Sequence, residues 1–267
     1  MKPLVILPRP KTKGFYQSWD GGAFRGLVKS WSRSGLVDIK RSESPFCWMN
    51  KIGDVLLYDR PTLEFLNPNL RYEIGLFGNP EPPVNGKRNS YWTFWSMIPQ
   101  RIDMFRKSLL SFNERDIRLL WIGSYENKTQ RGYRPVNWWE KSTDFCSYGP
   151  VREYTHSQYL MINRRARFGL CLRGYGPKCC RDIEYMALGV VPIMTHGCSV
   201  SYYNRLTPGL HYLYASCPDE AIDLTSSISE KSWKEMSNAC VEWYNQNCSS
   251  FGSFNTTMKI IDELRLR

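Results

Sequence analysis

One stretch of the chain constrains the fold more than any other. Residues 167–197 read RFGLCLRGYGPKCCRDIEYMALGVVPIMTHG. Within it, residues 168–172 form an apolar run of strand length, and after a turn residues 178–188 have helical spacing. Gly189 is suited to end that helix, and residues 190–194 resemble a second buried strand. The pattern predicts a strand–helix–strand unit of a parallel sheet.

The predicted helix has two faces at helical spacing. One face carries Cys179, Cys180, Ile183, Met186 and Ala187. The other carries Lys178, Arg181, Asp182, Glu184 and Tyr185. We therefore expect the first face to be buried, with the two cysteines in the core, and the second face to meet solvent or a ligand.

The turn at residues 173–176 contains two glycines and precedes the helix. Parallel sheets bind ligands at the carboxyl ends of their strands, where this turn would lie. Arg173, Lys178 and Arg181 would gather there with the amides of the helix start, which predicts an anion site. Glu184, one turn further on, would accept hydrogen bonds from ribose hydroxyls, so the set suits a nucleoside diphosphate. The alternative is that Arg181 and Glu184 form only an exposed ion pair.

These residues resemble the donor-binding signature of exostosin-type glycosyltransferases. Arg173-Gly174, Arg181 and Glu184 match the family's Arg-Gly turn and Arg-x-x-Glu helix, and residues 189–192 match its Gly-x-Val-Pro strand. The family usually has a serine just before the helical arginine, where this chain has Cys179 and Cys180. Backbone amides would therefore replace the contact from that hydroxyl to phosphate. The resemblance implies that the donor is held by Arg173, Gly174, Tyr175, Gly176, Lys178, Cys179, Cys180, Arg181 and Glu184.

In its small size the chain is more similar to the glycosyltransferases of large algal viruses, which include a xylosyltransferase, than to Golgi exostosins. The expected fold is α/β and compact GT-B-like, with two Rossmann-like βαβ domains facing a crevice. Residues 1–113 would form the acceptor-side domain and residues 114–250 the nucleotide-sugar-binding domain. Residues 251–267 would form a helix that returns to the first domain.

The resemblance implies an inverting hexosyl- or pentosyltransferase that moves a sugar, with xylose as one candidate, from a UDP-sugar to a glycan or glycoprotein acceptor. We expect no cofactor beyond the UDP-sugar, and no metal, because the chain lacks an Asp-x-Asp motif. The alternative function is a catalytically inactive carbohydrate- or nucleic-acid-binding module with a degenerate nucleotide site.

Loops after predicted strands supply the candidates for chemistry. Asp20 follows the strand at residues 3–7 and precedes a helix at residues 23–31, so it is a candidate general base or an N-cap. Asp59 follows the strand at residues 54–58. His196 follows the strand that ends at residue 194, and these three residues form the catalytic shortlist.

The second half repeats the pattern with a strand at residues 116–122 that enters a glycine. Ser124, Arg131 and Arg134 come from the basic segment after it, and they would reach the donor's phosphates or lie in solvent. Helices are expected at residues 101–112, 154–163, 230–246 and 254–266, and another strand at residues 72–77.

The formal net charge is +11, which indicates an anionic partner. Lysine and arginine are spread along the chain, so a nucleic-acid-binding stripe is not indicated. The nine cysteines include no CxxC spacing, which favours reduced thiols and a cytoplasmic location, the host cytoplasm for a viral protein. No apolar run approaches the length of a signal peptide or a membrane span.

Overall fold

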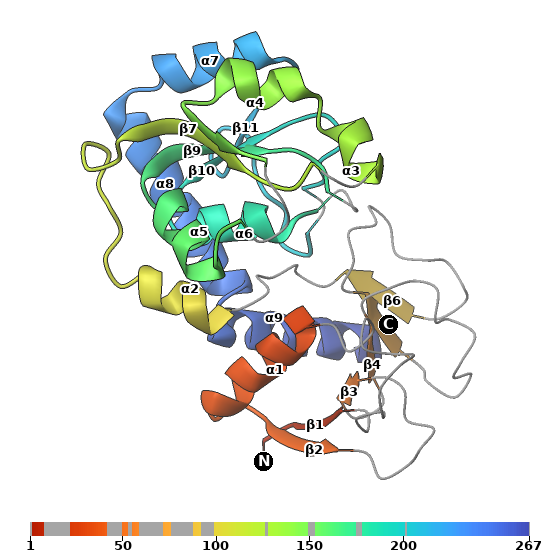
Figure 1. The fold of residues 1–267 in the computed structure, drawn as a ribbon. Helices are drawn as coiled ribbons and strands as arrows, with labels where there is room; N and C mark the ends of the chain where they lie inside the picture. Colours follow the sequence, from red (N-terminus) through yellow and green to blue (C-terminus); the bar gives the residue numbers. More distant parts are fainter. Residues whose placement is uncertain are drawn as a thin grey trace. The chain divides into compact units, whose positions relative to one another are not determined.

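The computed structural model describes residues 2–7, 22–41, 50–52, 55–58, 72–75, 88–91, 99–125, 128–148, 153–174, 178–200 and 202–266. The chain divides into two compact units, coloured along the sequence in Figure 1. The first unit comprises Met1–Gln100, Tyr202–Asn204 and Gln246–Arg267, and the second comprises Arg101–Ser201 and Arg205–Asn245. The acceptor-side and nucleotide-sugar-binding roles of the two predicted domains stay predictions.

The first unit contains a mixed sheet with the strand order β2-β1-β3-β4-β5-β6. Its strands are β1 (Leu4–Leu7), β2 (Asp38–Arg41), β3 (Asn50–Ile52), β4 (Val55–Tyr58), β5 (Tyr72–Gly75) and β6 (Arg88–Tyr91). β1 is parallel to β2, and β4, β5 and β6 are mutually parallel. β3 runs antiparallel to both of its neighbours, so this sheet is not wholly parallel.

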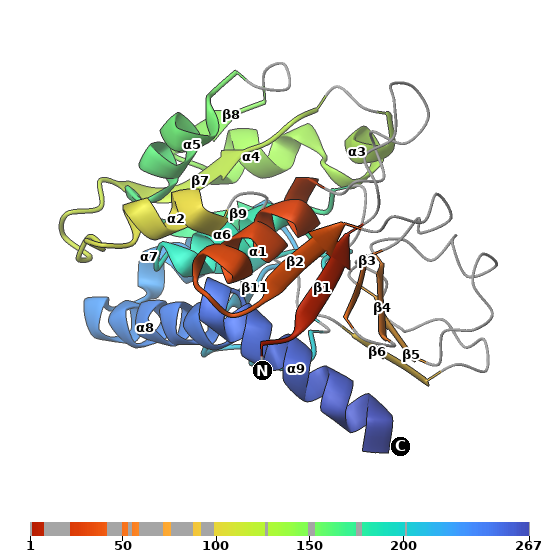
Figure 2. The ribbon, with the colours of Figure 1, turned by 90° about the horizontal axis from the view of Figure 1, so that it is seen from below.

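Two helices from opposite ends of the chain complete the core of the first unit. They are α1 (Gly22–Arg33) and α9 (Ser250–Leu266), and Figure 2 shows both of them near β1. Trp31 of α1 is fully buried, and its indole Nε1 donates a hydrogen bond to Ser253 Oγ at 2.8 Å. Its ring meets Phe254 edge-on, with centroids 5.9 Å apart. The core also contains Val5, Leu27, Val28, Val37, Ile52, Ile260 and Ile261.

The second unit contains a wholly parallel sheet with the strand order β11-β10-β9-β7-β8. Its strands are β7 (Ile117–Ile122), β8 (Phe145–Ser147), β9 (Ala166–Cys171), β10 (Val191–Met194) and β11 (Leu213–Tyr214). The chain passes from β7 to β8 on one side and then returns to β9 on the other side of β7. The strand order therefore reverses between β7 and β9.

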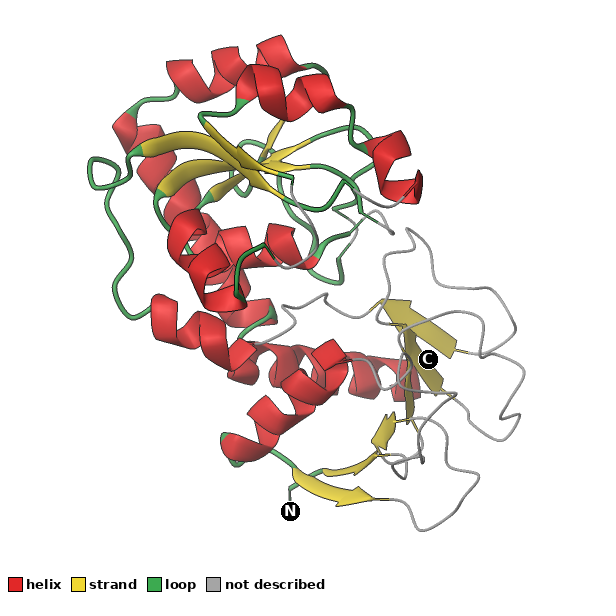
Figure 3. Cartoon of the chain, in the orientation of Figure 1, coloured by secondary structure: helices red, strands yellow, loops and turns green. Residues whose placement is uncertain are grey.

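Helices cover both faces of this sheet (Figure 3). α4 (Val136–Ser142) and α7 (Pro218–Ser227) lie on one face, and α5 (His156–Asn163) and α6 (Cys180–Ala187) lie on the other. The remaining helices of this unit are α2 (Pro99–Phe105), α3 (Lys128–Tyr133) and α8 (Glu230–Asn247). Alternate strand residues point to opposite faces, so Phe168 and Leu170 join the cluster under α4 and α7, whereas Gly169 faces α6.

Two glycines allow α6 to lie close to the sheet. A Cβ on Gly169 would lie 2.3 Å from the ring of Tyr185, which is fully buried, so no larger residue fits there while Tyr185 keeps its place. Gly189 has φ +67° and ends the helix in the left-handed conformation that glycine favours. The chain then enters β10, as the sequence predicts.

Two arginines form hydrogen bonds at the amino ends of the strands of this sheet. Arg115 is buried and donates to the carbonyl oxygens of Leu110, Ala166 and Leu188 at 3.1, 2.7 and 2.9 Å. Burial lowers the pKa of Arg115 to about 10, so it stays charged at neutral pH.

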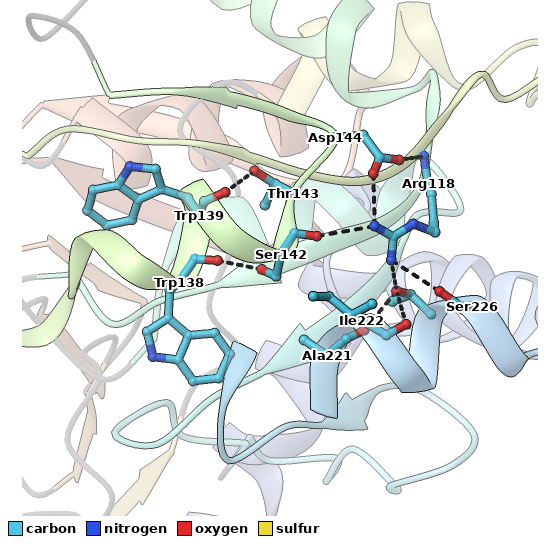
Figure 4. A network of polar contacts seen from close by, with 10 residues as sticks. Arg118, Trp138, Trp139, Ser142, Thr143, Asp144, Ala221, Ile222 and Ser226 are labelled. Atoms are coloured by element: carbon cyan, nitrogen blue, oxygen red, sulfur yellow. Dashed lines mark hydrogen bonds and ion pairs between the residues drawn. The ribbon is translucent and has the colours of Figure 1, made fainter. Parts of the chain in front are cut away.

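Arg118, at the start of β7, is the centre of the network in Figure 4. It donates to Asp144 Oδ1 at 2.9 Å, to Ser142 O at 3.4 Å and to Ser226 Oγ at 3.5 Å. A further bond of 2.6 Å runs to Thr225 Oγ1. Arg118 thereby joins β7 to the ends of α4 and α7.

The predicted α/β class is confirmed, and the strongly patterned elements lie within a few residues of their predicted positions. The helix predicted at residues 101–112 is too long, because α2 ends at Phe105. Leu109, which would extend its apolar face, is 40% exposed, so little burial supports further helical turns. Among the described strands, β2, β3, β6 and β8 were not predicted; each has only three or four residues.

Candidate functional site

The reversal of strand order between β7 and β9 is where an open α/β sheet is expected to bind a ligand. Such sheets bind ligands outside the carboxyl ends of their strands at this topological switch point. The loop after β7 begins at Gly123, and the loop after β9 leads through Arg173 and Gly174 to α6. Tyr175 and Gly176 of that loop lie outside the described residues. The predicted donor-binding residues that the structure describes therefore lie on these two loops and on the segments that follow them, from α3 to Arg134 and on α6.

Arg181 joins these two loops from the first turn of α6. Its Nη1 donates to Ile122 O at 3.0 Å and its Nη2 donates to Leu172 O at 3.2 Å. The residue is 7% exposed, and its guanidinium lies over the ring of Trp121 at 5.6 Å from the centroid. These contacts hold the end of β7 and the residue after β9 at a fixed separation.

Arg134, between α3 and α4, forms a second bridge across the same loops. Its Nε donates to Arg173 O at 3.0 Å, and its Nη1 donates to Ser124 O. Only 4% of Arg134 is exposed, and it also lies over Trp121, at 5.8 Å. The predicted phosphate contacts of Arg134 and Arg181 are untested, but both guanidinium groups already hydrogen-bond to the backbone.

Glycine allows the guanidinium groups to approach the loops. A Cβ on Gly123 would lie 2.8 Å from Arg181 Nη1. A Cβ on Gly174 would lie 2.9 Å from Cys179 Sγ and 3.3 Å from Arg134 Nη2. The distances of 2.8 and 2.9 Å are shorter than real Cβ contacts, so a larger residue at Gly123 or Gly174 would require the side chain of Arg181 or Cys179 to shift.

The switch point is positively charged and poorly solvated. Burial, and then the charge of Arg181, lower the pKa of Arg134 to about 10, so both arginines remain cationic at neutral pH. Asp182 is the carboxylate that offsets them, and burial raises its pKa. Two buried cations against one carboxylate leave a potential that attracts anions.

The rim of the site adds two more cations. The guanidinium of Arg173 stacks 4.1 Å from the ring centroid of Tyr133 in α3, and its side chain passes beside Gly197 in the loop after β10. Lys178 is 5% exposed, and burial lowers its pKa to about 8. Four of the five predicted cations therefore lie on the loops and the helix start of one edge of the sheet.

The start of α6 carries its own carboxylate. Cys179 is the N-cap residue, and its amide donates to Asp182 Oδ2 at 3.1 Å. An acidic side chain in the first turn stabilises the helix dipole, so part of the predicted attraction for phosphate is already satisfied within the chain. The thiol of Cys179 lies 3.9 Å from Leu172 O.

The predicted division of this helix into a buried and an exposed face is wrong. All residues from 181 to 187 are buried, whereas Cys179 and Cys180 are partly exposed. α5 packs beside this helix on the same face of the sheet, and its first residue, His156, contacts Glu184. The exposed ion pair considered for Arg181 and Glu184 is also wrong, because both residues are buried.

Glu184 instead pairs with a histidine on the neighbouring helix. Its Oε1 lies 3.0 Å from Nε2 of His156, the first residue of α5. His156 was not among the residues predicted for the site. Only the fold, which brings α5 beside α6, could have identified it.

The other predicted residues lie at different distances from this cluster. His196 is exposed in the loop directly after β10, at the same end of the sheet. Arg131 is exposed on α3 and donates to Tyr125 O at 2.9 Å. Asp20 and Asp59 lie outside the described residues. Trp121, Tyr133 and Asp182, which contact the predicted cations, were not expected in the site.

In the described part of the chain, no group of three His, Cys, Asp or Glu side chains is arranged to hold a metal ion. None of its helices is long and apolar enough to cross a membrane.

No family model matches the sequence, and no curated protein matches it. A solved structure of T4 phage beta-glucosyltransferase is similar over 98% of this chain and 100% of that chain, with 15% sequence identity and a TM-score of 0.49. A likeness at this level does not establish a shared fold.

Proposed function

We propose that this protein is a compact GT-B-like glycosyltransferase that moves a sugar from a UDP-sugar to a glycan or glycoprotein acceptor in the cytoplasm. The observation that carries the proposal is the position of the basic cluster. Arg134, Arg173, Lys178 and Arg181 gather at the switch point of a parallel sheet, beside the start of α6. Nucleotide phosphates bind at this place in open α/β sheets.

The cations would have two different roles in binding the diphosphate. Arg173 and Lys178, on the rim, would contact the phosphates. Arg134 and Arg181 would hold the two loops in place and contribute positive potential, because their guanidinium groups also bind carbonyl oxygens. Glu184, one turn into α6, would accept hydrogen bonds from the ribose hydroxyls.

Inverting transfer is the chemistry that the exostosin resemblance favours. The acceptor oxygen would form a bond to the anomeric carbon while the bond from that carbon to the diphosphate breaks. UDP would leave with the electron pair, stabilised by the cations without a metal ion. A general base would take the acceptor's proton, and Asp20 is the first candidate, followed by Asp59 and His196. Xylose is one candidate for the transferred sugar.

A second candidate function has its own support. The guanidinium groups of Arg134 and Arg181 are engaged with the backbone, and the N-cap amide of α6 is engaged with Asp182. A site satisfied in this way suits an inactive carbohydrate- or nucleic-acid-binding module with a degenerate nucleotide site. Such a module would ignore UDP, and any binding to RNA or DNA would fall steeply with salt.

Thermal-shift measurements with UDP, GDP and CMP sugars in EDTA test the proposal. A ligand at 100 times its Kd stabilises a protein by about 2.7 kcal/mol, so a UDP-sugar should raise the Tm by several degrees. Arg173→Gln should abolish most of that rise. Arg165→Gln is the matched control, because Arg165 precedes β9 at the opposite edge of the sheet and pairs with Asp116. Equal shifts in both variants, or no shift in the wild-type protein, would refute the proposal.

A further inference from the structure

The pairing of Glu184 with His156 connects the proposed donor site to a helix outside it. Glu184 is 4% exposed and lies in the second turn of α6. His156 begins α5, which packs against β9 beside α6. The two side chains meet between the helices, with 3.0 Å between Nε2 and Oε1.

The position of the histidine is fixed by its surroundings. Thr155 is the N-cap of α5, and it forms a capping box with Gln158, which holds the backbone at the helix start. The imidazole stacks on Tyr159, with ring centroids 5.8 Å apart and planes inclined by 17°. The ring therefore presents Nε2 to Glu184 in a defined orientation.

The chemistry of the two groups determines which atom donates the hydrogen bond. An ionised carboxylate only accepts hydrogen bonds, so in this pair Nε2 carries the hydrogen and donates a hydrogen bond to Oε1. Nδ1 of the same ring is buried and has no hydrogen-bond partner among the described residues. Within the described chain, the contact with Glu184 is thus the ring's only hydrogen bond through a nitrogen atom.

We propose that His156 is a positioning residue that orients the Glu184 carboxylate toward the ribose of the donor. This inference rests on the proposed function. A glutamate side chain has several rotatable bonds, and the hydrogen bond from His156 to Oε1 restricts them before the ligand arrives. The entropy cost of ordering this side chain is then not subtracted from the free energy of ligand binding. The bond from His156 uses one of about four lone-pair sites of a carboxylate.

A purely structural role is the competing explanation, and the test must separate the two. The probes are UDP and 2′,3′-dideoxy-UDP, which lacks the hydroxyls that Glu184 would bind. The readout is the ratio of their dissociation constants, measured by titration calorimetry in EDTA. Loosening of the fold weakens both ligands together and leaves the ratio unchanged, whereas misorientation of Glu184 weakens only UDP.

Three variants give the comparison. His156→Leu removes the donor and should reduce the preference for UDP on the order of tenfold. His156→Gln keeps an N–H donor of similar reach and should restore most of that preference. Gln158→Leu is the control, because it breaks the capping box of the same helix without touching Glu184. It should lower the Tm and keep the wild-type ratio.

Each outcome decides the matter. An unchanged ratio in His156→Leu would overturn the positioning role, as would an equal fall in Gln158→Leu. If His156→Leu does not fold, His156→Asn, whose shorter amide cannot reach Oε1, takes its place with the same expected loss. Wild-type protein that binds UDP without preference over the dideoxy compound would refute the ribose role of Glu184 and this inference while leaving the proposed function standing. Failure of the wild-type protein to bind UDP would refute both.

Discussion

Replacing Arg181 with methionine should affect stability more than nucleotide binding. The guanidinium donates to Ile122 O and Leu172 O from a buried position, so the substitution leaves two buried carbonyl groups without these donors. Each unpaired group costs about 1–3 kcal/mol. Methionine partly offsets this loss, because it fills similar space and removes the desolvation cost of a buried cation. We therefore expect a net loss of about 3 kcal/mol.

Calorimetric unfolding measures this change. For a chain of this size, about 1 kcal/mol corresponds to roughly 2–4 °C in Tm, so Arg181→Met should melt about 6–12 °C below the wild-type protein. Arg165→Met is the control, since Arg165 forms an exposed ion pair with Asp116. Exposed pairs contribute less than about 1 kcal/mol, and the control should melt within about 3 °C of the wild type.

UDP binding at a temperature well below the transition completes the test. If Arg181 acts mainly as a bridge between loops, the folded variant should bind UDP with less than about a tenfold loss, which corresponds to about 1.4 kcal/mol. A variant with wild-type Tm that no longer binds UDP would refute this reasoning. It would show that the guanidinium binds the ligand and that its bonds to the two carbonyl oxygens contribute little.

Further predictions concern three of the remaining site residues. Because burial lowers the pKa of Lys178 to about 8, the free protein loses this charge as the pH rises through that value, so UDP affinity should fall above about pH 8, and Lys178→Arg should abolish the decline. Without UDP, stability should rise from about pH 8 to about pH 10, since the unfolded chain then binds more protons. Glu184→Gln should weaken UDP binding in calorimetry by about 1–3 kcal/mol, and unchanged affinity would exclude the ribose contact. Asp20→Asn should keep the wild-type Tm and UDP affinity but lose about 10²-fold or more in turnover, because asparagine caps a helix as well as aspartate but takes no proton; full activity would move the base to Asp59 or His196.

The central strand–helix–strand unit could be predicted because its signals are local. An apolar run, a glycine turn, helical spacing and Gly189 specify β9, α6 and β10 without reference to the rest of the chain. The predicted cations Arg173, Lys178 and Arg181 also follow from that unit, since the turn and the helix start must lie at the carboxyl edge of the sheet.

The partners of those cations could not be predicted, because they come from distant parts of the chain. Arg134 donates to the carbonyl oxygen of Arg173 and Arg181 to that of Ile122, and no spacing rule identifies a backbone acceptor. The error about the exposed face of α6 has the same origin. Helical periodicity shows that polar residues share a face, but it does not show that α5 covers that face and supplies His156 to Glu184.

In the first sheet, the hydrophobic pattern of the sequence does not predict the shortest strands. β3 has three residues, and its antiparallel pairing with β1 and β4 depends on register rather than composition. The predicted βαβ pattern holds for β1, α1 and β2, which are parallel and consecutive in the chain.

Titration of UDP into the wild-type protein in EDTA tests the central claim most directly. We predict saturable binding at one site with a Kd below about 1 mM, the upper end of ordinary substrate affinities. Arg173→Gln should weaken this binding at least tenfold, and Arg165→Gln should not change it. A folded wild-type protein that gives no saturable heat with millimolar UDP, or an Arg173→Gln variant that binds as tightly as the wild type, would contradict a diphosphate site at the switch point.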